Sequence, residues 1–137
     1  MSRLREGGCQ CGSVRYGVTG EPKTVVVCHC SECQRQTGSA FGMYVLFAKN
    51  QFTLKSGTLK TFSRVADSGR PMHSHFCPDC GTQIYQEKEP SSTIVIVTAG
   101  SLDDASSWRP SSQLWTRSKH PWLELPADIR SFEVQPA

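Results

Sequence analysis

Alternating apolar and polar positions give the first indication of structure in this chain. Val14, Tyr16 and Val18 alternate with polar or small residues, which is typical of a strand buried on one face, and Gly20 and Pro22 then indicate a turn. Short apolar or β-branched runs predict further strands over residues 25–28, 41–48, 51–55, 58–64, 72–76, 82–86 and 94–99. Only short turn sequences separate these runs, whereas a parallel pair needs a crossover of about a dozen residues. The pattern therefore predicts a mainly β fold of one or two packed antiparallel sheets.

Helical patterns are scarce and short. Residues 31–36 predict about one and a half helical turns, ended at Thr37 and Gly38, because glycine tolerates a positive φ. Residues 101–108 predict a second helix with Ser101 as its N-cap and with Asp103 and Asp104 in its first turn. The chain is thus expected to add short helices to its sheets.

Three tryptophans, Trp108, Trp115 and Trp122, fall seven residues apart near the C-terminus. This spacing resembles a heptad, but Pro110 and Pro121 would interrupt any helix that carried it. We interpret the tryptophans instead as aromatic plugs from a C-terminal segment that wraps the sheets.

Length and charge narrow the class of protein. A chain of 137 residues is expected to form a single domain, here taken as residues 1–137. The formal net charge is only +3, and the basic residues are scattered rather than clustered, so we expect no nucleic-acid partner. No apolar stretch approaches the ~18 residues that a membrane span requires, and no signal sequence is visible at the N-terminus. We therefore expect a cytoplasmic protein without a membrane partner, and the sequence leaves a homodimer open.

Cysteine carries the candidate chemistry. In a reducing compartment, cysteines at short spacings point to metal binding or catalysis before disulfides. The seven cysteines fall into three groups, namely Cys9 and Cys11; Cys28, Cys30 and Cys33; and Cys77 and Cys80. The two distant pairs can complete one closed zinc site of four thiolates, which would be structural. The remaining three can hold a second ion and leave one coordination position open, as catalytic zinc sites do.

Other roles for the three-cysteine group stay open at this stage. A histidine from His29, His73 or His75 could close the site, Cys30 and Cys33 could form a redox pair, or the thiols could be buried and inert. In a locally extended chain the side chain of His29 would point away from its cysteine neighbours. We expect the histidines to be packed or to lie outside the ligand set. His120 supports no prediction.

A zinc ion on three thiolates can accept a fourth and generate a nucleophile at neutral pH. We therefore expect a thiol as the exogenous ligand, with glutathione as the co-substrate. Basic side chains would hold the carboxylates of such a thiol, and Arg35 is the candidate nearest the three cysteines, with Arg64 and Arg70 as weaker ones.

Three motifs together resemble a known family, the glutathione-dependent formaldehyde-activating enzymes, which also include centromere protein V. The matching segments are Gly8-Cys9-x-Cys11-Gly12-x-Val14-x-Tyr16, Cys28-His29-Cys30-Ser31-x-Cys33-Gln34-x-x-Thr37-Gly38 and Phe76-Cys77-x-x-Cys80-Gly81-Thr82. The resemblance implies a β-tent of antiparallel sheets with two zinc ions. It also implies that Cys9, Cys11, Cys77 and Cys80 hold the structural ion and that Cys28, Cys30 and Cys33 hold the catalytic one.

The activity implied by this resemblance is that of a carbon–sulfur lyase that joins glutathione, or a related thiol, to formaldehyde or another small aldehyde. Its partners would be a small-molecule thiol and an aldehyde. Two functions of other classes remain as alternatives: a non-catalytic, zinc-stabilised protein-binding module, as centromere protein V suggests, and a thiol redox protein.

Overall fold

The computed structural model describes residues 3–89, 93–106 and 108–135. Its strands are β1 (Leu4–Gly8), β2 (Arg15–Thr19), β3 (Thr24–Cys28), β4 (Gly42–Ala48), β5 (Phe52–Ser56), β6 (Lys60–Val65), β7 (Pro71–Phe76), β8 (Gln83–Lys88), β9 (Ile94–Thr98), β10 (Ser112–Leu114) and β11 (Arg130–Ser131). The helix α1 (Ser31–Thr37) and the 3-10 turns η1 (Lys49–Gln51), η2 (Ala99–Ser101) and η3 (Thr116–Ser118) complete the described elements. The predicted mainly β class with a short helix is confirmed.

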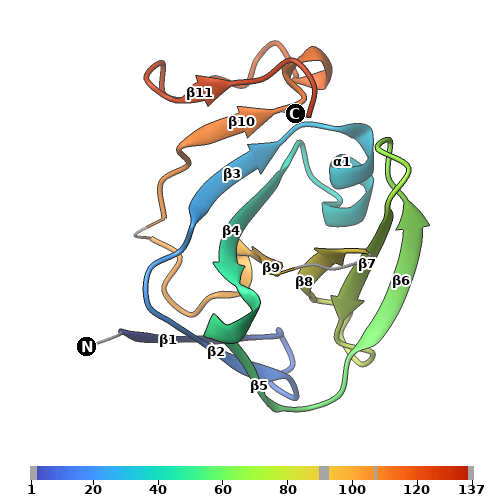
Figure 1. The fold of residues 1–137 in the computed structure, drawn as a ribbon, viewed down its shortest axis with the longest axis vertical. Coiled ribbons are helices and arrows are strands. Elements are labelled where there is room, and N and C mark those ends of the chain that lie inside the picture. The colour runs from blue at the N-terminus through green and yellow to red at the C-terminus, as the bar shows by residue number, and fades with distance from the viewer. Residues whose placement is uncertain (1–2, 90–92, 107, 136–137) are drawn as a thin grey trace.

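The strands form two sheets. The smaller has the order β1-β2-β5, and the larger has the order β11-β10-β3-β4-β9-β8-β7-β6. All pairings are antiparallel except those of β10, which runs parallel to both β3 and β11. In Figure 1 the larger sheet bends so that β3 and β4 lie opposite β6 and β7, with α1 between them and the smaller sheet at the base. The bend thus brings β3 and β4 to face β6 and β7 across the molecule.

The core lies between the two sheets, and the predicted alternation accounts for it. Val14, Tyr16 and Val18 are fully buried, as their period of two requires. The central strand β4 is buried on both faces, because Val45 and Phe47 join this core while Tyr44 joins a second cluster. That second cluster contains Cys28 and Cys33 beside Val26 and Tyr44. One strand therefore links the main core to the cysteine group.

The helix predicted over residues 101–108 is wrong in its described part; Ser107 lies outside the described residues. The chain instead forms η2 and an isolated β-bridge between Gly7 and Leu102. Tertiary contacts override the local signals: the Asp103 carboxylate accepts two hydrogen bonds from Arg15, one of them 2.9 Å long. The Ser101 hydroxyl donates to the Thr98 carbonyl instead of capping a helix. The predicted N-cap Ser101 thus bonds a local carbonyl, and the predicted first-turn carboxylate of Asp103 binds Arg15 on β2.

The tryptophan plugs are confirmed at two of three positions. Trp108 packs edge-on against Phe47 with ring centroids 6.4 Å apart, and Trp115 packs against the second cluster. Trp122 is 70% exposed, so the prediction is wrong there. Its ring stacks on His120 near the surface, and this contact does not bury it. The C-terminal segment therefore covers the sheets with its first two tryptophans.

Candidate functional site

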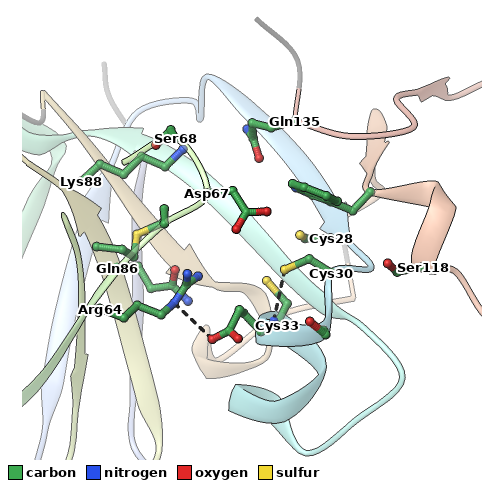
Figure 2. Close-up of a pocket in the computed structure, with 15 residues that line it drawn as sticks. Cys28, Cys30, Cys33, Arg64, Asp67, Ser68, Gln86, Lys88, Ser118 and Gln135 are labelled. Carbon is green, nitrogen blue, oxygen red and sulfur yellow. Dashed lines mark hydrogen bonds and ion pairs between the residues drawn. The ribbon is translucent and has the colours of Figure 1, made fainter. Parts of the chain in front are cut away.

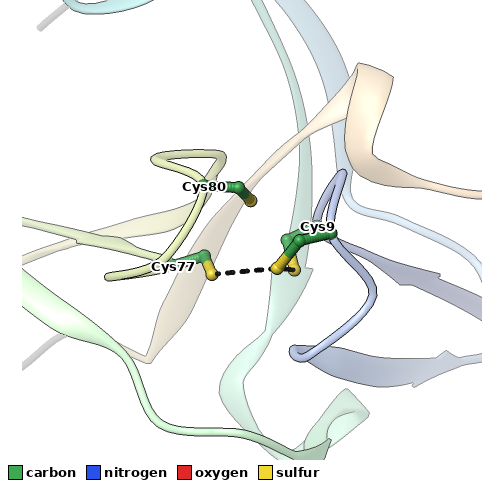
Figure 3. A group of neighbouring side chains, drawn as sticks. Cys9, Cys77 and Cys80 are labelled. Carbon is green, nitrogen blue, oxygen red and sulfur yellow. Dashed lines mark hydrogen bonds between the residues drawn. The ribbon is translucent and has the colours of Figure 1, made fainter.

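Four cysteines converge where the β1–β2 turn meets the β7–β8 turn (Figure 3). The sulfurs of Cys9 and Cys11 are 3.6 Å apart, and those of Cys11 and Cys77 are 3.8 Å apart. A tetrahedral ion with Zn–S bonds of about 2.3 Å requires sulfur–sulfur distances of about 3.8 Å. Cys80 completes the set, and all four sulfurs lie within 4.8 Å of one another. The donor set and its spacing fit one closed metal site.

Hydrogen bonds orient these sulfurs. The backbone N–H of Val14 donates to Cys9 Sγ at 3.2 Å, and that of Asp79 donates to Cys77 Sγ at 3.4 Å. The Thr82 hydroxyl lies 3.3 Å from Cys80 Sγ, and hydrogen bonding from Thr82 lowers the pKa of Cys80 to about 5. Such contacts favour the thiolate form that binds metal.

Sequence reasoning missed one polar neighbour of this cluster. The Ser13 hydroxyl lies 3.2 Å from Cys11 Sγ and 3.4 Å from Cys77 Sγ, so it bridges the two halves of the site. Its position two residues after Cys11, within the first motif, was the available signal.

The other three cysteines lie on one strand end and the helix that follows it. Cys28 ends β3, Cys30 is the N-cap of α1, and Cys33 lies in the first turn of that helix. Their sulfurs lie within 4.8 Å of one another, and the Cys33 N–H donates to Cys30 Sγ at 3.3 Å. Hydrogen bonds from Cys28 and Cys33 lower the pKa of Cys30, while the same sharing of protons raises the pKa of Cys28. The group is compatible with a second metal site.

The local sequence explains this geometry. The helix ends as predicted at Gly38, which adopts φ 64° and ψ 28° as the C-cap. A left-handed C-cap favours glycine because a side chain there would be strained. Strand β3 pairs with β4 and β10, which fixes Cys28 opposite Gly42 and Leu114. The three sulfurs are therefore held between a three-stranded segment of sheet and a well-capped helix.

The three-cysteine group opens onto a cavity of about 230 Å³, whereas the four-cysteine set is complete in itself. Figure 2 shows the cysteines on one side of this cavity and Arg64, Gln86 and Lys88 on the other. The full lining is Cys28, Cys30, Ser31, Glu32, Cys33, Arg64, Ala66, Asp67, Ser68, Met72, Gln86, Lys88, Trp115, Ser118 and Gln135. The cavity therefore lies between the end of β3 with α1 on one side and strands β6 to β8 on the other, with the C-terminal segment along its rim.

The basic residues that line the cavity do not include Arg35, the first candidate for binding the carboxylates of the thiol. Arg35 is exposed on α1 and does not line the cavity. Arg64 from β6 and Lys88 from β8 do line it, and the Arg64 guanidinium lies 3.7 Å from the Glu32 carboxylate. The bend of the larger sheet brings both side chains to the cysteines from more than 30 residues away in the sequence. The sequence offered Arg64 only as a weaker candidate, and it did not indicate Lys88.

The histidines join neither cysteine group in the described chain. His29 is fully buried, and its Nε2 lies 2.8 Å from Gln113 Oε1, in agreement with the predicted opposite orientation. His73 Nε2 lies 2.9 Å from Glu89 Oε1, directly after β8, and His75 Nε2 lies 2.9 Å from Glu87 Oε1 on β8. Within the part of the chain that the structure describes, no histidine nitrogen lies within 4.8 Å of all three of these sulfurs.

Two aromatic residues shape the surroundings of the three sulfurs. Tyr44 packs beside Cys28 and Cys33, and its buried hydroxyl has no hydrogen-bond partner within the described residues. Burial raises the pKa of Tyr44, so the group remains a neutral hydroxyl. Trp115 lines the cavity with φ 59° and ψ 45°, a left-handed conformation that is costly for a bulky side chain. It is the sole non-glycine residue with positive φ in the part of the chain that the structure describes.

A comparison with known protein families fits this arrangement. The family model described as glutathione-dependent formaldehyde-activating enzyme matches residues 4–118, which include all seven cysteines. The chain belongs to this family. Both cysteine groups of this family member are compatible with metal sites, as the resemblance implied.

A solved structure supports the fold. The crystal structure of a Rhodobacter sphaeroides protein from a structural genomics programme matches with a TM-score of 0.57 and 19% sequence identity. The match covers 72% of this chain and 87% of that one. Among the described residues of the present family member, none of the helices has the length and apolar character needed to traverse a bilayer.

Proposed function

We propose that the protein is a zinc-dependent enzyme of the carbon–sulfur lyase type that joins glutathione or a related thiol to formaldehyde or another small aldehyde. The observation that carries the proposal is the unequal pair of cysteine sites. Cys9, Cys11, Cys77 and Cys80 form a complete ligand set, which suits a structural ion. Cys28, Cys30 and Cys33 offer only three sulfurs and face a cavity.

Zinc held by Cys28, Cys30 and Cys33 would supply a Lewis acid that favours the ionised form of a thiol ligand. In the addition, a bond forms between the thiol sulfur and the aldehyde carbon, and the carbonyl π bond breaks. The proton lost by the thiol ends on the carbonyl oxygen, so the reaction needs neither oxidant nor reductant.

The chain contributes binding and shielding. Met72 is buried and Trp115 half-buried, and both give the cavity an apolar wall that limits water beside the reacting atoms. Arg64 and Lys88 are placed to attract an anionic ligand, because they line the cavity opposite the cysteines. The position of Arg35 outside this cavity favours Arg64 and Lys88 over Arg35 as partners for the carboxylates of the thiol.

The test is the exchange of formaldehyde with its glutathione adduct, followed by NMR in the presence of the zinc-loaded protein. The wild-type protein is expected to accelerate the exchange, and Cys33→Ser is expected to lose the acceleration together with one zinc ion. No acceleration by a wild-type protein that carries two zinc ions would contradict the proposal. A disulfide between Cys30 and Cys33 that forms reversibly under mild oxidant, with no exchange activity, would favour the redox alternative.

A further inference from the structure

Two opposite charges at the cavity are left without protein partners. Within the described residues, neither the Lys88 ammonium nor the Asp67 carboxylate forms an ion pair or a side-chain hydrogen bond. Both nevertheless line the same cavity as the three sulfurs, and they do not pair with each other. In Figure 2 Lys88 extends from one wall, and Asp67 projects from the loop between β6 and β7. Among the described residues that line it, the cavity therefore presents the Lys88 ammonium and the Asp67 carboxylate to a ligand without an ion-pair partner.

The neighbouring charges are already engaged. Arg64 lies 3.7 Å from Glu32, so each offsets the other. Lys88 is half-buried, and its pKa is lowered first by desolvation and then by repulsion from Arg70 and Arg64, while the Cys28 thiol acts in the opposite direction. Burying an unpaired charge is costly, and a ligand anion would remove that cost.

We propose that the cavity recognises the α-amino-acid group of its thiol ligand, with Lys88 binding the carboxylate and Asp67 binding the ammonium group. This inference rests on the proposed function and adds the ligand class and two residues that determine specificity. A cavity of about 230 Å³ is below the usual range for drug-sized ligands, which begins at roughly 300 Å³, and suits one amino-acid-sized group beside the sulfurs. Free cysteine and the γ-glutamyl end of glutathione both carry this chemistry.

Isothermal titration of the zinc-loaded protein with four thiols tests the inference. Cysteine carries both charges, cysteamine lacks the carboxylate, 3-mercaptopropionate lacks the ammonium group, and 2-mercaptoethanol lacks both. Lys88→Met is expected to weaken cysteine and 3-mercaptopropionate by about tenfold, the size of one charge-assisted contact, and to leave cysteamine unchanged. Asp67→Asn is expected to weaken cysteine and cysteamine by about threefold, because Asp67 is exposed and its contact is screened.

Lys60→Met is the matched control, since Lys60 is exposed on β6 and does not line the cavity. Each comparison is made between variants with the same ligand, so differences in intrinsic thiol acidity cancel. A titration with glutathione separates the two possible ligands. If Lys88→Met weakens the binding of glutathione and of cysteine equally, the ligand group is the γ-glutamyl end of glutathione. If it weakens the binding of cysteine alone, the ligand is the free amino acid.

Two negative results are distinguishable. If the wild-type protein binds all four thiols and Lys88→Met weakens them no more than Lys60→Met does, the inference is overturned and the proposed function stands. If the wild-type protein with two zinc ions binds none of the thiols, both the inference and the proposed function fail.

Discussion

Replacing one cysteine in each group is expected to affect stability unequally. Cys11 and Cys77 are 66 residues apart in sequence, and a metal ion on the four-cysteine group would tie the smaller sheet to the larger one. In the loop-entropy treatment of cross-links, closing a loop of this length stabilises the folded state by about 4 kcal/mol. Cys28 and Cys33 are only five residues apart, for which the same treatment gives about 2 kcal/mol.

These differences in the free energy of unfolding correspond to decreases in the melting temperature. With an unfolding entropy of about 2.1 cal/mol/K per residue, a chain of 137 residues loses about 14 °C in melting temperature for 4 kcal/mol and about 7 °C for 2 kcal/mol. Cys80→Ser should therefore lower the melting temperature about twice as much as Cys33→Ser. Because a domain is stable by only about 5–15 kcal/mol, the loss in Cys80→Ser is a large fraction of the free energy of unfolding.

The assay is thermal unfolding by circular dichroism, paired with zinc content by mass spectrometry on the same samples. Each variant is expected to hold one zinc ion where the wild type holds two. Equal losses of melting temperature, with one ion missing from each variant, would refute the assignment of a structural role to one group alone. An unchanged zinc content in Cys33→Ser would refute the second metal site.

Three further predictions concern residues around these groups. Tyr44→Phe should weaken zinc binding at the three-cysteine site by about threefold to tenfold, because the unpartnered hydroxyl can donate to a thiolate beside it; unchanged affinity in a chelator competition would contradict this. Asp103→Asn should destabilise the protein by under about 1 kcal/mol at neutral pH, since the pair with Arg15 is solvent-exposed. The Arg15 hydrogen bonds hold the pKa of Asp103 below 3.8, so this contribution is present above that pH and is lost as pH falls through the lowered value, where urea titrations of variant and wild type should converge. Arg64→Gln should raise the KM for an anionic thiol more than Arg35→Gln does, and the reverse order in steady-state kinetics would restore Arg35 as the carboxylate partner.

Local pattern was sufficient for the parts of the fold that local forces determine. The alternation of Val14, Tyr16 and Val18 predicted a half-buried strand because period-two burial is a property of the strand itself. Gly38 predicted the end of α1 for a similar local reason. Cysteine spacing predicted both groups, since two ligands a few residues apart on a turn can reach the same ion.

Non-local contacts account for what the sequence did not reveal. The helix expected over residues 101–108 does not form, because Asp103 pairs instead with Arg15, a residue 88 positions away. Strand β10 was missed because a three-residue strand that pairs in parallel carries almost no periodic signal. Likewise, Lys88 and Asp67 meet the cysteines only because the larger sheet bends, and bending is not encoded in any short window of sequence.

The unequal spans of the two cysteine groups also govern when each can assemble during synthesis. Residues 28–33 leave the ribosome together, so a nascent chain can present all three of these thiols long before the sheets exist. The four-cysteine group has to wait for Cys80 and for the meeting of both sheets. Its loading therefore requires the two sheets to have met, whereas early metal uptake would belong to the three-cysteine group, whose ion would have to stay bound until the rest of the protein folded around it.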